Sequence, residues 1–371
     1  MSGVRKEEEA ASGRIAVAMS GGVDSSVAAL LLHEKGESLV GISLQLFDAG
    51  AMGLSRFGRC CSPSDFVDAR KVAHRLGISY YVLNMEREFR QAVIENFIDE
   101  YDQGRTPLPC ARCNTEVKFG ELLHRARTLG CETVATGHYA RRAWDPATSR
   151  TKLFRSVDRE KDQSYFLFGL TPDQLDRALF PVGEMKKESV RELARRAGFC
   201  VADKQESMDL CFLPAGGYRS FLERERGTGS SEGGEIIDAQ GTVLGRHDGV
   251  RHFTVGQRRG LGLATGKPMY VLAIEPGPAR VIVGEREEQE RTHCVVRAPN
   301  WVSARPPSGS IEAMVQIRHR HPGGEAVVQP DPGGGVAIRF RIPQRAITPG
   351  QAAVFYRDDE VLGGGTIASV H

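Results

Sequence analysis

The sequence has no run of about 18 apolar residues, so no segment is expected to span a membrane. Aromatic residues make up only 7% of its 371 residues, and the 49 basic and 47 acidic residues nearly balance. Without an excess of either sign, the overall charge does not indicate a nucleic-acid partner. Residues 1–13 are polar and lack the apolar core of a signal peptide. We therefore expect a cytoplasmic protein with a disordered tail at 1–13 and no membrane association.

Cysteine is present at eight positions, which are 60, 61, 110, 113, 131, 200, 211 and 294. In a chain of this length without a signal peptide, reactive thiols, metal ligands or small core residues are more plausible than a disulfide framework. The adjacent pair Cys60-Cys61 is compatible with a redox role or with a strand edge. Cys131, Cys200 and Cys294 are expected to be core thiols.

The strongest motif is a small-residue loop between a strand and a helix. The apolar run Ile15–Met19 predicts a buried parallel strand, and residues 27–32 predict a helix; between them lies Ser20-Gly21-Gly22-Val23-Asp24-Ser25-Ser26. Glycine allows close backbone approach, and the N–H groups at a helix N-terminus favour an anion. The spacing is not that of the G-x-x-x-x-G-K-[ST] loop. The segment closely resembles the loop of enzymes that split ATP into AMP and pyrophosphate, with Asp24 a candidate for orienting Mg²⁺ or the nucleotide.

Alternating strand and helix patterns over the first 140 residues predict an α/β fold with a parallel sheet. Residues 171–197 are expected to form one helix. From about residue 212, glycine-rich turns and short alternating runs predict a small β-rich domain and then a C-terminal antiparallel β-barrel. We place a catalytic domain at 14–210, the central domain at 211–290 and the barrel at 291–371. The barrel region has nine arginines and no lysine, which suits RNA but is weak evidence alone.

Two segments that contain cysteine are candidates for supplying reactive thiols. Cys113 follows Arg112 near the predicted start of a helix, where a thiolate is favoured. Cys211 lies close to Glu206 and Asp209 at a predicted domain junction. From this segment alone, Cys211 could equally be a small buried hydrophobic residue.

Taken together, the chain resembles the bacterial tRNA-specific 2-thiouridylases, which thiolate the wobble uridine of some tRNAs. The resemblance covers nearly the whole length. Its motifs are AMSGGVDS (18–25), GRTP…CN-x-E-x-KF (104–119), ATGHYAR (135–141), KDQSYFL (161–167), the Cys211 segment, HFTVGQRRGL (252–261) and TPGQAAVFY…LGGG (348–365). It implies a catalytic domain of the adenine-nucleotide alpha-hydrolase type.

The resemblance also implies site residues. ATP contacts would come from Ala18, Met19, Ser20, Gly21, Gly22, Val23, Asp24, Ser25, Leu44 and Gly137. Contacts with tRNA would come from Leu108, Pro109, Cys110, His138, Lys161, Asp162, Gln163, Arg318, His319 and Gln351. Cys113 matches the family's nucleophile and Cys211 its persulfide-carrying cysteine. The implied partners are ATP with Mg²⁺, a tRNA with uridine at the wobble position, and an upstream sulfur donor, either a sulfurtransferase or a cysteine desulfurase.

The chain departs from the family at one site. The better-known pattern has asparagine-proline-aspartate before the nucleophile, contacting the target base, and the matching residues here are Leu108-Pro109-Cys110. A proton-transfer role for that aspartate cannot be carried over. Cys110, Cys113 and Cys211 together offer three thiolates, enough to hold a [4Fe–4S] cluster with one open iron. Two routes of sulfur delivery, a persulfide relay and such a cluster, therefore remain as alternatives.

A second function class is an ATP pyrophosphatase-type ligase or amidotransferase that acts on a small molecule. Such an enzyme would also use the loop at residues 20–26, called the phosphate loop below. This function gives no role to the two cysteine segments. A non-enzymatic RNA-binding protein leaves the phosphate loop without a role.

Overall fold

The structure, a computed structural model, describes residues 13–48, 63–205, 210–214, 216–227, 233–303, 305–331 and 333–371. The predicted tail up to residue 12, the Cys60-Cys61 pair and the two carboxylates Glu206 and Asp209 lie outside the described residues. No helix within the described ranges is long and apolar enough to cross a membrane.

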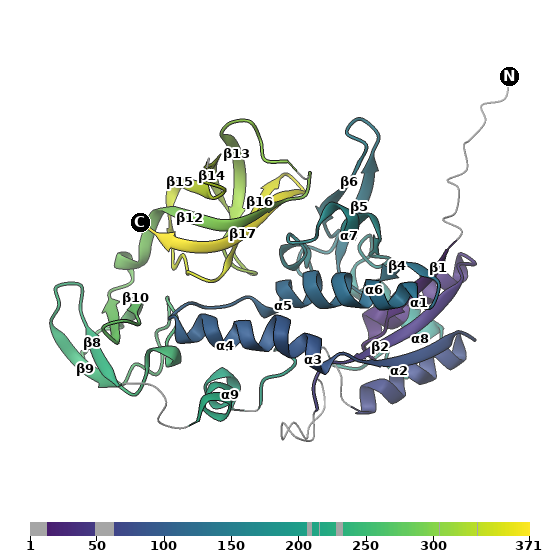
Figure 1. Ribbon diagram of the computed structural model, residues 1–371, viewed down its shortest axis with the longest axis horizontal. Coiled ribbons are helices and arrows are strands. Elements are labelled where there is room, and N and C mark those ends of the chain that lie inside the picture. The colour runs from purple at the N-terminus through teal and green to yellow at the C-terminus, as the bar shows by residue number, and fades with distance from the viewer. Residues whose placement is uncertain are drawn as a thin grey trace.

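The N-terminal region is built on a parallel five-stranded sheet, which confirms the predicted α/β fold (Figure 1). Its order is β3 (Ser79–Asn84), β2 (Leu39–Gln45), β1 (Arg14–Ala18), β4 (Cys131–Ala135) and β7 (Ala178–Leu179). The central strands are apolar on both faces because helices cover both sides of the sheet.

Two separate cores flank this sheet. Helices α1 (Val23–Glu34), α2 (Pro63–Arg75) and α8 (Lys187–Arg196) pack on the face that carries Ile15 and Val17. The opposite face, which carries Ala16 and Ile42, is covered by two helices with π-helical middle segments. The first consists of α3 (Glu86–Phe89), η1 (Arg90–Ile94) and α4 (Glu95–Asp102), and the second of α5 (Pro109–Arg112), η2 (Cys113–Glu121) and α6 (Leu122–Arg127).

The prediction of a single helix over residues 171–197 is wrong. A short helix, α7 (Pro172–Asp176), is followed by β7, which pairs with β4, and only then by α8. Pro181 disfavours helix at the residue before it. A Cβ on Gly183 would overlap the carbonyl oxygen of Ala140, so the chain fits there only as a glycine turn. Contacts with β4 and with residue 140 therefore override the local helical pattern.

The central region contains α9 (Gly217–Arg226) and a four-stranded sheet with its own small core. The strand order is β10 (Tyr270–Glu275), β11 (Arg280–Gly284), β8 (Gly234–Ile237) and β9 (Val243–His247), with short 3₁₀ turns η4 (Val250–His252) and η5 (Glu287–Gln289). Helix α9 packs against the N-terminal region, which corresponds to the predicted catalytic domain at 14–210 and is called the catalytic region below. At this contact, Phe221 meets Phe97 and Phe212 edge to face.

The C-terminal region is a closed antiparallel barrel of six strands, which confirms the predicted barrel. The order is β12 (Glu290–Trp301), β15 (Val336–Arg345), β14 (Gly324–Pro330), β13 (Ile311–Gln316), β16 (Ala352–Arg357) and β17 (Glu360–Val370), closed by the pairing of β12 with β17. A hairpin from the N-terminal region, β5 (Ala140–Asp145) and β6 (Arg150–Arg155), joins this sheet through the pairing of β6 with β17. The catalytic region and the barrel therefore share one continuous sheet.

Candidate active site

A cavity of about 390 Å³ lies at the carboxyl ends of β1, β2 and β4. This is the place where strand order reverses direction around β1 and where parallel sheets bind ligands. All residues predicted to contact ATP line it, which are 18–25, Leu44 and Gly137. The same cavity also contains Cys113 and Cys211. The structure thus brings the phosphate loop and both predicted catalytic cysteines together.

Two glycines allow the walls to close around the loop. Gly21 has φ +72°, and a Cβ there would overlap the backbone of Asp65 at the start of α2. A Cβ on Gly137 would lie 2.5 Å from the backbone nitrogen of Ser25. The N-cap residue of α1 is Gly22, which has no side chain to cap the helix. The helix dipole and the N–H groups of the first turn are therefore available to an anion in the cavity.

Asp24, the predicted magnesium or nucleotide ligand, is held by two side chains. Both of its carboxylate oxygens lie 2.8 Å from Nζ of Lys187, and Oδ1 accepts a hydrogen bond from the Tyr139 hydroxyl at 2.8 Å. Lys187 is only 7% exposed, so its ammonium is shielded from water, whereas the Asp24 side chain, which lines the cavity, is 29% exposed. Lys187 was not among the predicted site residues, because no local motif marks it.

A second lysine, Lys204, touches the phosphate loop directly. Its Nζ donates to the Gly21 carbonyl oxygen at 3.0 Å and to carboxylates of Asp65 and Asp68 at 2.7 Å each. Burial opposes the charged form of Lys204, but the hydrogen bonds to the two aspartates outweigh it and raise its pKa. The lysine also lines the cavity and lies seven residues before Cys211 in the sequence.

The three thiols occupy different environments around the cavity. Cys113 is 8% exposed in η2, Cys110 is exposed one turn earlier, and Cys211 is half-buried. Arg112, which we expected beside the Cys113 thiol, pairs with Glu116 at 2.7 Å and donates to the Ala92 carbonyl oxygen at 2.8 Å. Its charge is therefore shared with a carboxylate. Cys113 sits within a π-helical segment, a feature frequent at functional sites.

A polar wall faces the cysteines. His138 has its Nδ1 2.7 Å from the Thr136 hydroxyl, and burial, followed by the charge of Lys118, lowers its pKa well below 6.5. His138 is therefore neutral at physiological pH. Lys118 donates to Oδ1 of Asn114 at 3.0 Å, and both line the cavity. Their spacing of one helical turn was visible in the sequence, but the proximity of Lys118 to His138 was not.

The residues predicted to contact tRNA fall into three groups. Pro109, Cys110, His138 and Gln163 line the cavity, and Leu108 precedes them at the start of α5. Arg318 and His319 are exposed, and Lys161 is half-buried. The side chains of the other two residues hydrogen-bond to other residues of the chain.

Asp162 is buried and accepts a hydrogen bond from Arg155 at 3.0 Å. Gln351 donates to the carbonyl oxygens of Thr106 and Pro107 at 3.1 Å each. Both side chains are therefore engaged within the molecule, at the junction of the two regions.

Among the described residues, no three His, Cys, Asp or Glu side chains form a group that could hold a metal ion. Cys110, Cys113 and Cys211 are all within the described ranges, and they line one cavity without forming such a group. As placed, the three thiols therefore offer no site for a single metal ion. Mg²⁺ that arrives with ATP needs few protein ligands, because phosphate oxygens and water supply most of its coordination.

Comparisons with known families cover most of the chain. Residues 13–215 match the family model described as tRNA methyl transferase HUP domain. Residues 219–285 match the tRNA methyl transferase PRC-barrel domain, and residues 291–367 match the aminomethyltransferase beta-barrel domain.

Curated relatives match over nearly the full length. A tRNA-specific 2-thiouridylase MnmA from Acidobacterium capsulatum is 48% identical over 367 residues, which cover 95% of this chain and 98% of the relative. One from Geobacter metallireducens is 50% identical over 364 residues, with 97% and 98% covered. Among solved structures, the NMN synthetase from Francisella tularensis is 17% identical with a TM-score of 0.33, covering 58% of this chain and 72% of its own, a likeness too low to bear on the fold. At about half identity over their whole length, these relatives show that the chain belongs to the family of tRNA-specific 2-thiouridylases.

Proposed function

We propose that the chain is an ATP-dependent tRNA sulfurtransferase that replaces the C2 oxygen of the wobble uridine with sulfur. The observation that carries the proposal is the shared cavity, in which the phosphate loop and Cys113 and Cys211 line the same space. An activating group and a sulfur nucleophile must both reach one uracil carbon, so they must share a site. The family membership supports the same activity.

The first step activates a poor leaving group. The C2 oxygen of uracil attacks the α-phosphorus of ATP, forming an O–P bond as the bond to pyrophosphate breaks. The N–H groups and the dipole at the N-terminus of α1 stabilise the negative charge on the departing pyrophosphate. Mg²⁺ bound to the phosphate oxygens would add to this charge stabilisation.

The second step delivers sulfur. A persulfide on Cys211, loaded by an upstream sulfurtransferase or cysteine desulfurase, carries the sulfur atom. The Cys113 thiolate attacks the Cys211 sulfur, forming a Cys113–Cys211 disulfide and releasing hydrosulfide. Hydrosulfide attacks C2 and expels AMP, and an external dithiol supplies two electrons to reduce the disulfide. The base reaches the cavity by leaving its stack, and the half-buried Phe166 in the cavity wall is suited to pack against it.

A [4Fe–4S] cluster on Cys110, Cys113 and Cys211, which line the same cavity, is the alternative sulfur route. Anaerobic purification followed by iron and acid-labile sulfide assays separates the routes. Full thiolation by iron-free protein supports the relay. Iron that is bound stoichiometrically and lost together with activity in Cys110→Ser would favour the cluster.

The proposed activity is tested by AMP formation from ATP with and without an unmodified tRNA transcript, together with 2-thiouridine formation. We expect tRNA to stimulate AMP formation, and we expect Cys113→Ser and Cys211→Ser to reduce thiolation by roughly 10³-fold or more. The expectation that Cys200 is a core thiol is wrong, because Cys200 is exposed. It lies outside the cavity, so Cys200→Ser is the matched control and should retain activity. If the rate of AMP formation is the same with and without tRNA and is unchanged in both cysteine variants, the protein is instead a small-molecule ligase or amidotransferase.

A further inference from the structure

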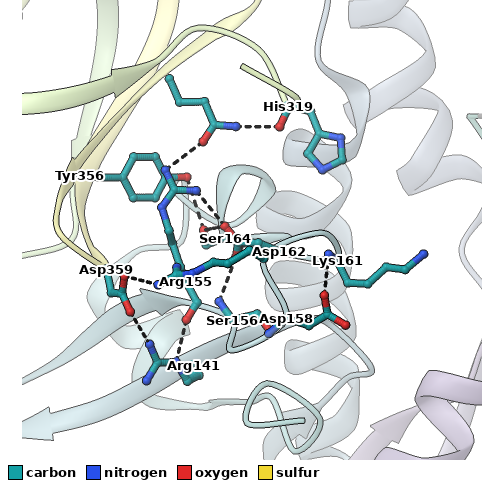
Figure 2. A network of polar contacts seen from close by, with 12 residues as sticks. Arg141, Arg155, Ser156, Asp158, Lys161, Asp162, Ser164, His319, Tyr356 and Asp359 are labelled. Carbon is teal, nitrogen blue, oxygen red and sulfur yellow. Dashed lines mark hydrogen bonds and ion pairs between the residues drawn. The ribbon is translucent and has the colours of Figure 1, made fainter. Parts of the chain in front are cut away.

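Arg155, at the end of β6, lies where the catalytic region meets the barrel (Figure 2). Its Nη1 donates to Asp162 at 3.0 Å and its Nη2 donates to Oε1 of Gln316, in β13, at 3.1 Å. Its guanidinium carbon lies 3.6 Å from the ring centroid of Tyr356, in β16. One planar cation thus contacts two barrel strands and the segment 161–163.

The Asp162 carboxylate is also held by residues that are close to it in the sequence. Its carboxylate also accepts hydrogen bonds from the backbone N–H groups of Ser156 at 3.0 Å and Ser164 at 3.2 Å, and from the Ser164 hydroxyl at 2.9 Å. A carboxylate that is 9% exposed and so fully engaged is built into the fold rather than presented to a ligand. In Figure 2 the neighbouring Lys161 side chain points away from this network.

The same segment continues into the active site. The backbone N–H of Gln163 donates to the Tyr139 carbonyl oxygen at 2.8 Å, and Oε1 of Gln163 accepts from the Tyr139 N–H at 3.0 Å. Tyr139 in turn donates to Asp24 of the phosphate loop. Arg155 is therefore connected through adjacent residues to the wall of the cavity.

On the barrel side, Gln316 fixes an exposed turn. Its Nε2 donates to the carbonyl oxygens of Arg318 at 3.1 Å and His319 at 2.6 Å, and its side chain is buried. The turn consists of three consecutive exposed residues, Arg318, His319 and Arg320. The His319 ring centroid lies 4.5 Å from that of Phe166, which lines the cavity. The turn is thus held directly beside the cavity.

We infer that Arg155 and Gln316 are positioning residues that hold the cationic turn 318–320 beside the catalytic cavity, so that one RNA is gripped there while its base enters the cavity. Arginine pairs with phosphate and stacks on bases, and imidazole also stacks, so this turn suits RNA. The inference rests on the proposed function for the identity of the RNA. Breaking the link should weaken RNA binding while leaving ATP binding and the chemical step intact.

The test variants act on Gln316, because removing Arg155 would leave the buried Asp162 charge without its cation. Gln316→Glu keeps an acceptor for Arg155 but cannot donate to the two carbonyl oxygens of the turn. Gln316→Leu removes both contacts at similar volume. The matched control is Asp359→Asn, which weakens the pairing of Asp359 with Arg141 and Arg159 at the same junction but leaves the turn untouched.

We expect both Gln316 variants to raise the Kd and KM for an unmodified tRNA transcript by about tenfold, the loss of roughly 1.4 kcal/mol. Their kcat and their KM for ATP should stay within about twofold of the wild type, and Asp359→Asn should match the wild type in all four constants. A raised KM for tRNA beside an unchanged kcat and an unchanged KM for ATP is a pattern that a general loss of stability does not predict.

The outcomes separate the inference from the proposed function. If the wild type thiolates tRNA and both Gln316 variants keep its Kd and KM, the inference is overturned and the proposed function stands. If the wild type binds tRNA without thiolating it and the variants bind it more weakly, the inference stands and the proposed function fails. A wild type that does not bind tRNA overturns both.

Discussion

Two lysines reach the phosphate loop from a distant part of the chain. Lys187 contacts Asp24 across 163 residues of sequence, and Lys204 contacts the Gly21 carbonyl oxygen across 183. Each ammonium already faces carboxylates, with Asp24 on one and Asp65 and Asp68 on the other. Because these carboxylates neutralise the lysines, the attraction for phosphate depends strongly on the backbone N–H groups at the start of α1. The lysines chiefly fix the shape of the loop.

Lys204→Met tests this at the scale of one residue. Loss of the ammonium leaves the buried Asp65 carboxylate without its cation and releases the Gly21 carbonyl oxygen. We expect the Kd for ATP to rise about tenfold and the free energy of unfolding to fall by roughly 2–4 kcal/mol. Titration calorimetry with ATP and urea unfolding measure the two effects. Lys204→Arg, which keeps the charge, should lie between the variant and the wild type, and an unchanged ATP affinity in Lys204→Met would refute the role.

Among the elements, the turn after β7 determines how the edge of the parallel sheet meets the hairpin. Gly183 lies against the carbonyl oxygen of Ala140, the first residue of β5, and its own carbonyl oxygen accepts a hydrogen bond from the Ser156 hydroxyl at 3.0 Å. The β5–β6 hairpin continues into the barrel sheet. A shift of this turn is therefore transmitted toward both the cavity and the barrel.

Gly183→Ala is expected to be strongly destabilising, because its Cβ would overlap backbone rather than a movable side chain. We expect the free energy of unfolding to fall by roughly 2–4 kcal/mol. Gly277→Ala is the control, since a Cβ there has no heavy atom within 4 Å. Chemical denaturation of the two variants side by side checks the prediction, which fails if both unfold at the same denaturant concentration.

The same elements show what sequence could and could not predict. The strand, loop and helix from Ile15 to Leu32 were predictable, because their apolar runs and glycines are local signals. Strand β7 has only two residues and exists through its pairing with β4, so local periodicity suggested a helix instead. The contact of Gln351 with Thr106, 245 residues away in the sequence, was likewise invisible in its motif. Lys187 and Lys204 were missed for the same reason. Motif resemblance selected residues around the site, while contacts distant in sequence determine what each side chain touches.

At the scale of the whole molecule, the catalytic region and the barrel share one sheet through the pairing of β6 with β17, and they are also joined by polar contacts. Glu100 in α4 pairs with Arg105 at 2.7 Å and with Arg297 of β12 at 2.9 Å. Burial alone would raise the pKa of Glu100, but the two arginines outweigh it and lower the pKa below 4.5. The stability that this cluster contributes is present above pH 4.5 and is lost as the pH falls through the lowered value. Acid therefore weakens the contact between the catalytic region and the barrel.

Buried histidines act in the same direction at higher pH. His321 in the barrel is 8% exposed, its Nδ1 accepts from the Gly323 N–H at 3.2 Å, and burial, with the nearby Arg318, lowers its pKa from 6.5 to about 4. The folded protein keeps this imidazole neutral, whereas the unfolded chain takes up a proton below about pH 6.5. Stability from this group is therefore present above pH 6.5 and is lost as the pH falls toward 4, by on the order of 2 kcal/mol at about pH 5.

Urea unfolding of the wild type and His321→Asn, at about pH 8 and about pH 5, measures this contribution. Asparagine retains an acceptor for the Gly323 N–H but takes up no proton, so the variant should lose less stability between the two pH values, by on the order of 2 kcal/mol. His293→Asn, at an exposed histidine of the same barrel, should keep the wild-type dependence. If His321→Asn and the wild type lose stability in parallel, the acid sensitivity of the barrel has another origin, and the Glu100 cluster is the next group to examine by Glu100→Gln.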